Sequence, residues 1–140
     1  MPYTVSLVAL KCEISQEDNG DEIYVLLNKQ AVWSVAGDYK MHQRPSEPHH
    51  IKEIDFVEGR WLLRDGWQPI PDFDPMDFIF TGQALPGVFQ IWDHDDFSRD
   101  DHIGDIPFGR SEAGRGQITV AAVGDGAHYL LVYELVLEDL

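Results

Sequence analysis

Apolar and polar residues alternate over short stretches of this chain, which is typical of β-strands that bury one face. The strongest stretch runs from Tyr129 to Leu137 and is rich in branched and aromatic residues. Residues 28–30 separate two such stretches and indicate a hairpin. The other stretches with this pattern cover residues 3–10, 23–27, 31–35, 51–57, 78–80, 88–92, 103–108 and 117–123. Short strands at fairly regular spacing, with almost no helical periodicity, predict an all-β sandwich or barrel.

Two stretches lack the alternation. Residues 36–50 are polar, contain Pro45 and Pro48, and predict a surface excursion that adds nothing to the core. Residues 58–76 contain several prolines and glycines and predict a long loop that carries Trp61 and Trp67. The chain of 140 residues has the length of one domain, so we expect a single domain over residues 1–140.

The composition is strongly acidic, with a formal net charge of -15 and an isoelectric point near 4.4. Binding to nucleic acid needs clustered Lys and Arg, and the ten basic residues here are scattered, so nucleic acid is not an expected partner. No stretch reaches the ~18 apolar residues of a transmembrane helix, and the beginning of the chain lacks the pattern of a signal peptide. We therefore expect a soluble chain and leave its compartment open. The single cysteine, Cys12, cannot form an internal disulfide, and we expect it to be a small buried residue.

Six aspartates lie within residues 93–105, directly after an apolar strand. Carboxylates about 4 Å apart repel by about 1 kcal/mol in water and by more at lower dielectric, so a fold that brings them together needs a cation. Asp93 and Asp95 end the strand on one side of the sheet, with the carbonyl of His94 between them. Asp101 returns from the far side of a short loop. Such an all-oxygen site suits calcium better than magnesium or zinc, although the spacing does not fit an EF-hand.

The segment Trp92–Gly104 resembles the third calcium-binding loop of C2 domains. The family pattern is an aspartate, any residue, a second aspartate, five residues, a third aspartate and a nearby Ile-Gly. The segment Asp21–Val25 is similar to the Ser-Asp-Pro-Tyr-Val sequence at the end of the family's first loop, with Asp21 at the ligand position. The segment Asp74–Phe80 is similar to the family sequence that leads into a later strand. Together these resemblances span most of the chain.

The resemblance implies an eight-stranded antiparallel β-sandwich that binds one or two calcium ions in loops at one end. It also implies calcium-dependent docking on a protein or a phospholipid surface. Because the first-loop sequence follows the very first strand, it implies the circularly permuted topology, in which the last strand, around Tyr129–Leu137, replaces the leading strand. The candidate metal ligands are then Asp93, Asp95, Asp101, Asp21 and Asp18, with the carbonyl of His94.

The sequence departs from the family in two places. The second aspartate of the first loop would fall at Ser15, so Asp18 or Glu17 must substitute or the site loses a ligand. The first-loop sequence and the Asp74–Phe80 segment are unusually far apart, which predicts an insertion at residues 36–70.

Several residues have an alternative interpretation. Phe97, at the tip of the aspartate loop, matches a position where membrane-binding relatives carry an apolar residue that enters the bilayer; the alternative is a partly buried loop anchor. The alternative for the whole chain is a metal-independent structural or protein-interaction sandwich. Its contact residues would be Trp33, Trp61 and Trp67.

Other residues that could carry chemistry favour simpler interpretations. We expect His42, His49 and His50 to lie in a solvated loop and not to bind a transition metal. Asp72, Asp74 and Asp77 are expected to be loop and turn residues. The chain has no Gly-x-Ser-x-Gly elbow and no phosphate-binding glycine loop, so an enzyme is not expected.

Overall fold

The computed structural model describes residues 2–138 and is built almost entirely of antiparallel β-strands, as the sequence predicts. Four strands form one sheet, in the order β11 (Asp101–Phe108), β10 (Gly87–Asp93), β2 (Ile23–Leu27) and β3 (Gln30–Ser34). The second sheet has the order β12 (Gln117–Gly124), β13 (Ala127–Leu137), β1 (Tyr3–Ile14), β6 (Glu53–Asp55), β7 (Arg60–Leu63) and β8 (Gly66–Pro69), and β9 (Ile79–Gly82) also pairs with β1. The remaining described elements are β4 (Lys40–Met41), β5 (His50–Ile51) and two short 3-10 helices, η1 (Pro75–Phe78) and η2 (Arg110–Glu112). Neither of these helices could span a membrane.

The two sheets pack face to face because alternate residues of their strands are apolar. In β1, Tyr3, Val5 and Leu7 are buried and the residues between them are partly exposed. Phe89 of β10 contacts Tyr133 of β13, with ring centroids 5.7 Å apart, and this contact joins the two sheets. The all-β sandwich fold is therefore confirmed.

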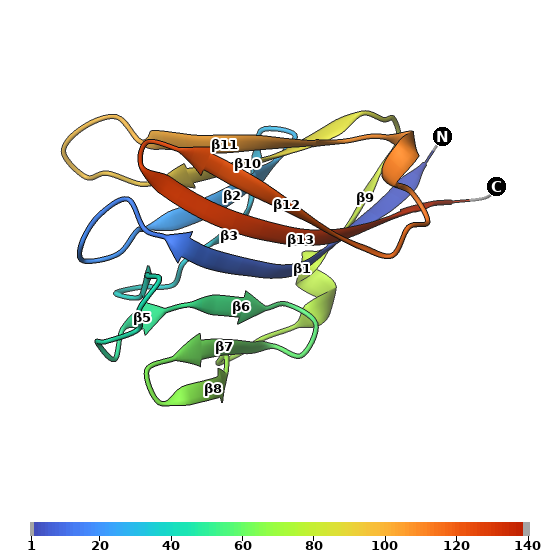
Figure 1. Cartoon of the computed structure of the whole chain (residues 1–140). Helices are drawn as coiled ribbons and strands as arrows, with labels where there is room; N and C mark the ends of the chain where they lie inside the picture. Colours follow the sequence, from blue (N-terminus) through green and yellow to red (C-terminus); the bar gives the residue numbers. More distant parts are fainter. Residues whose placement is uncertain (1, 139–140) are drawn as a thin grey trace.

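Strand β1 is the centre of the larger sheet. It pairs along nearly its whole length with the last strand, β13. Its other edge is shared between two strands: Tyr3–Ser6 pairs with β9, and Ala9–Lys11 pairs with β6. The insertion thus continues the sheet from the second half of β1 through β6, β7 and β8 (Figure 1).

The expected eight strands are present outside the insertion, and five more described strands lie within residues 36–70. The predicted hairpin after β2 is present, with Asn28 and Lys29 at φ 49° and 71° in its turn. Strand β1 is longer than expected and continues to Ile14. Strands β4 and β5 pair in parallel in a separate two-stranded sheet, and all the described strand pairs within the two larger sheets are antiparallel.

The structure differs from the predictions for residues 36–50 and 58–76. Residues 36–50 contribute to the core, because Met41 is fully buried and His42 and His50 are 9% and 3% exposed. Residues 58–76 are not one long loop, because β7 and β8 form a hairpin; Gly66, the first residue after its turn, has φ 108°. Strands of two to four residues are too short to show an alternation in the sequence, and their burial depends on the sheet they join.

Three connecting segments meet at one end of the sandwich (Figure 1). They are the first loop, residues 15–22 between β1 and β2; the third loop, residues 94–100 between β10 and β11; and the segment that carries β4 and β5. The sequence motifs for calcium binding lie in the first and third loops. We call these two loops the loop rim.

Candidate metal centre

Asp21, at the end of the first loop, is fully buried. Its main chain pairs with Met41 of the insertion in an isolated β-bridge, with N–O distances of 2.8 and 2.9 Å. Its carboxylate accepts hydrogen bonds from the N–H groups of Gln16 and Glu17, at 2.8 and 3.0 Å. The hydroxyl of Tyr129, from the middle of the larger sheet, donates a third bond at 2.7 Å. These donors fix the position of a buried negative charge.

Asp93 ends β10 and is 2% exposed. It pairs with Ile23 at the start of β2, so the register of the smaller sheet places the end of β10 beside the first loop. Its Oδ1 accepts a hydrogen bond from the N–H of Glu22 at 2.9 Å. The N–H of the next residue, His94, donates back to the carbonyl of Glu22 at 2.9 Å. Neighbouring strands therefore hold Asp93 and Asp21 together.

Glu17, Asp21 and Asp93 form a carboxylate cluster in which one oxygen of each residue lies within 4.8 Å of the others. Burial, and next the negative charge of Asp21, raise the pKa of Asp93 to about 7. The pKa of Glu17 is also raised, first by partial burial and then by Asp21. Three carboxylates at this distance repel one another, and a bound cation would relieve that repulsion.

The donor chemistry of the cluster fits a hard cation. A carboxylate has about four lone-pair positions, and hydrogen bonds from the described residues use three on Asp21 and one on Asp93. Both side chains therefore keep oxygen lone pairs for a further partner. Glu17 is exposed and, among residues 2–138, no protein donor bonds to its carboxylate. All-oxygen donors of this kind suit calcium.

The other predicted ligands lie outside this cluster. Asp18 is exposed and its main-chain carbonyl accepts a bond from His42, whereas the carboxylate of Glu17, the other residue that the sequence left open, lies in the cluster. Asp95 accepts a bond from the N–H of Phe97 at 3.1 Å within its own loop. The negative charge of Asp95 still raises the pKa of Glu17, and that of Asp101 raises the pKa of Asp93. Asp95 and Asp101 are thus near enough to act on the cluster electrostatically.

The third loop is held mainly by its own polar groups. The His94 ring bonds to Asp96 at 2.9 Å and to Asp100 at 3.1 Å, and its bond with Asp96 is the main reason that its pKa is raised. Asp100 also accepts bonds from the Asp95 N–H at 3.0 Å and from the hydroxyl of Tyr24 at 2.6 Å. The side chains of Asp96 and Asp100 therefore shape the loop.

The side chains of Glu22, His94 and Asp96 form a second group within 4.8 Å of one another, on the surface. Phe97, at the tip of the third loop, is 99% exposed. Its side chain is therefore not a buried anchor of the loop.

Two histidines of the insertion hold the first loop in place, which the sequence did not predict. His42 donates from Nε2 to the Asp18 carbonyl at 2.9 Å and accepts at Nδ1 from the Arg44 N–H at 2.9 Å. His50 donates in the same way to the carbonyl of Asn19 at 3.2 Å, and the two rings stack with centroids 4.5 Å apart. The expectation of a solvated histidine loop was wrong, because the β4–β5 pair places both rings against the first loop. No local spacing could have shown that contact.

No model of a known protein family matches this sequence, and no curated protein matches it. The solved structures that resemble it include C2 domains, the family that the third-loop sequence resembles. One C2 domain is 12% identical with a TM-score of 0.46, over 98% of this chain and 99% of that chain. A C2 domain of a plant extended synaptotagmin 1 is 8% identical with a TM-score of 0.47, over 99% of this chain and 96% of that chain.

A human GIVD cytosolic phospholipase A2 is also similar to this chain. It is 14% identical with a TM-score of 0.46, and the match covers 99% of this chain and 16% of that chain. Because the identities and TM-scores of these matches are low, the fold described above rests on the strand order and packing of this chain itself.

Proposed function

We propose that this chain is a calcium-binding C2-like module that docks on a protein or a phospholipid surface through its loop rim. The observation that carries the proposal is that Glu17 and Asp21 of the first loop lie close to Asp93 at the end of β10. In this proposal the module binds and does not catalyse.

Calcium is the proposed ion because it takes six to eight oxygen ligands in flexible geometry, more than the three residues of the cluster supply. Asp95 and Asp101 are the next candidate ligands, since their charges already act on the cluster. The carbonyl of His94 is a further candidate, and water would complete the shell. Bound calcium would supply the positive charge that the buried pair of Asp21 and Asp93 lacks.

The loop rim has the properties of a calcium-dependent docking surface. Phe97 projects from its tip, and burying one such ring contributes roughly 2 to 3 kcal/mol. The formal net charge of -15 opposes approach to an anionic bilayer, and bound calcium would reduce the negative potential at the rim. Docking should therefore require the ion as well as the apolar tip.

The decisive experiment compares thermal unfolding in millimolar calcium and in chelator. At a calcium concentration one hundred times the Kd, binding stabilises the folded chain by about 2.7 kcal/mol. For a chain of this size, that gain raises Tm by roughly 5 to 15 °C. Asp93→Asn should abolish the shift. Asp65→Asn, in the β7–β8 turn, removes the same charge away from the cluster and should preserve the shift.

Coincident unfolding curves of the unmodified chain in calcium and in chelator would reject calcium binding. They would favour the metal-independent interaction sandwich. If the curves do separate, sedimentation of the calcium-bound chain with phosphatidylcholine vesicles, with and without phosphatidylserine, distinguishes a lipid surface from a protein partner.

A further inference from the structure

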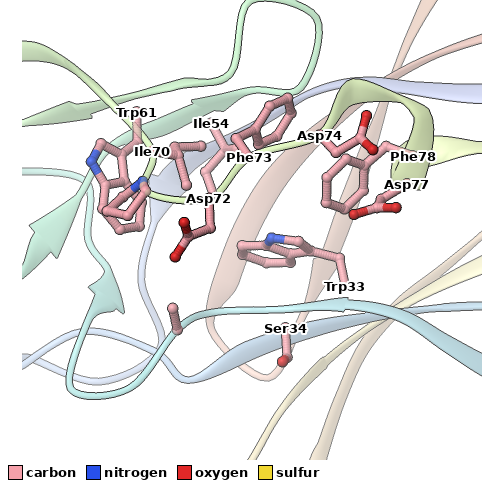
Figure 2. A pocket seen from close by; sticks show the side chains of 12 residues that line it. Trp33, Ser34, Ile54, Trp61, Ile70, Asp72, Phe73, Asp74, Asp77 and Phe78 are labelled. Carbon is pink, nitrogen blue, oxygen red and sulfur yellow. The ribbon is translucent and has the colours of Figure 1, made fainter.

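An aromatic pocket of about 150 Å³ lies between the end of β3, the insertion and the segment before β9 (Figure 2). Its walls include Trp33, Trp61, Phe73 and Phe78. Three carboxylates also line it, those of Asp72, Asp74 and Asp77. None of its lining residues belongs to the carboxylate cluster.

The aromatic walls are held by other rings and are therefore preformed. Trp33 packs edge-on against Phe56 at a centroid distance of 5.8 Å, and Phe56 packs against Phe78 at 4.8 Å. Phe73 stacks on Phe78 at 5.3 Å with an interplanar angle of 18°. Trp61 is only 6% exposed. Of the three tryptophans proposed as contact residues, Trp33 and Trp61 thus share one pocket, and they do not form a flat exposed patch.

The edge of the aromatic pocket carries negative charge, and no basic side chain of the described residues pairs with it. No Lys or Arg lines it, and Asp72, Asp74 and Asp77 take part in none of the ion pairs within residues 2–138. Asp74 uses one oxygen to accept from the Met76 N–H at 3.0 Å. Figure 2 shows the carboxylate of Asp72 in the space between Trp61 and Trp33, and that of Asp77 beside Phe78. Aromatic faces and unpaired carboxylates together select an organic cation.

The same chain already holds one arginine in this manner. The guanidinium of Arg60 lies 4.5 Å from the centroid of the Trp67 ring. Its Nε also donates to Oδ2 of Asp55 at 3.1 Å. The aromatic pocket offers the same two kinds of partner, aromatic rings and carboxylates, and among residues 2–138 no Lys or Arg side chain lines it.

We propose that the aromatic pocket binds an arginine side chain of a protein partner. A guanidinium is planar, stacks on aromatic faces and donates several hydrogen bonds to carboxylates at the same time. A lysine ammonium is a compact, strongly hydrated charge that stacks less well, and a quaternary ammonium has no N–H to give to the carboxylates. The large negative charge of the chain favours a basic partner segment.

The test is a titration of the chain with acetyl-arginine methylamide in chelator, followed by the NMR signals of the Trp33 and Trp61 indole N–H groups. Chelator separates this test from the proposed calcium function. The expected result is a saturable shift of both signals that the uncharged acetyl-citrulline methylamide does not produce. We expect acetyl-lysine methylamide and its trimethylated form to bind at least about threefold more weakly.

Variants decide which residues form the site. Asp72→Asn and Asp77→Asn should each weaken binding by about threefold, since each removes one exposed charge partner. Trp67→Ala removes an exposed indole outside the pocket and should leave the titration unchanged. Equal shifts with citrulline, tighter binding of the lysine or trimethyl-lysine compound, or the absence of saturation would each overturn the proposal.

Discussion

The first and third loops lie at the same end of the sandwich and are stabilised in opposite ways. The first loop is fixed from outside: Tyr129 and the insertion's His42 and His50 all bond to it. The third loop is exposed, and most of its bonds join its own residues. The comparison indicates that the buried half of the proposed calcium site is preformed and that the exposed half is free to adjust to an ion or a surface.

The largest expected effect is a pH dependence of stability, which comes from the buried carboxyl group of Asp93. The pKa of Asp93 is about 7 in the folded chain against an ordinary value of 3.8, so the folded state binds the proton more tightly. This contribution to stability is complete below pH 4 and is lost as the pH rises through 7. In chelator, the loss of unfolding free energy from Asp93 should reach about 4 kcal/mol at most.

Saturating calcium should remove that loss, because the ion binds the ionised carboxylate. Urea unfolding between pH 4 and 8 measures the effect, with Asp93→Asn as the comparison that cancels the other titrating groups. Parallel pH profiles for the two proteins in chelator would show that Asp93 does not carry the effect.

The next effect compares one carboxylate from each loop. Asp21→Ala leaves three donors without a partner in a buried site, although it also relieves the repulsion of Asp93. We expect a net loss of about 2 kcal/mol in the free energy of unfolding in chelator. Asp95→Ala, in the partly exposed third loop, should change it by about 0.5 kcal/mol. Equal losses for the two variants would contradict the difference between the loops.

The carboxylates of the third loop can be predicted from the sequence more easily than those of the first loop. The third loop is one continuous segment, so the spacing of Asp93, Asp95 and Asp101 can be read directly. The support of the first loop comes from Tyr129 and from the insertion, far away in the chain. Only the folded sheet shows that Glu17, and not Asp18, reaches the cluster.

The same contrast applies to the fold as a whole. Long strands such as β1 and β13 bury one face, and their alternation predicts them well. Strands β4 to β8 have at most four residues. Strand β6 pairs with the edge of β1, β4 and β5 pair with each other, and packing between rings adds to the stability of this region. The aromatic pocket could not be predicted from the sequence either, because Trp33 and Phe73 are far apart in the chain and come together only in the folded structure.

A smaller effect should follow from loosening the link between the insertion and the first loop. His42→Ala removes the bond to the Asp18 carbonyl and the stacking on His50, so we expect a stability loss of about 1 kcal/mol. The proposed calcium affinity should fall by about threefold, because the first loop must then be ordered on binding. Isothermal titration calorimetry measures the affinity. His102→Ala, which removes an exposed histidine paired with Asp105, is the matched control and should leave the affinity unchanged.

The smallest effect on stability should come from the most exposed residue of the loop rim. Phe97 is 99% exposed, so Phe97→Ala should change the free energy of unfolding by no more than about 0.5 kcal/mol. If the rim docks on lipid, the same variant should weaken calcium-dependent sedimentation with vesicles by at least about tenfold, since the ring's contribution to burial is lost. Unchanged vesicle binding in calcium would instead assign the docking energy to the ion and the carboxylates. In that case the exposed half of the site would act through its charge, and its apolar tip would have no part in docking.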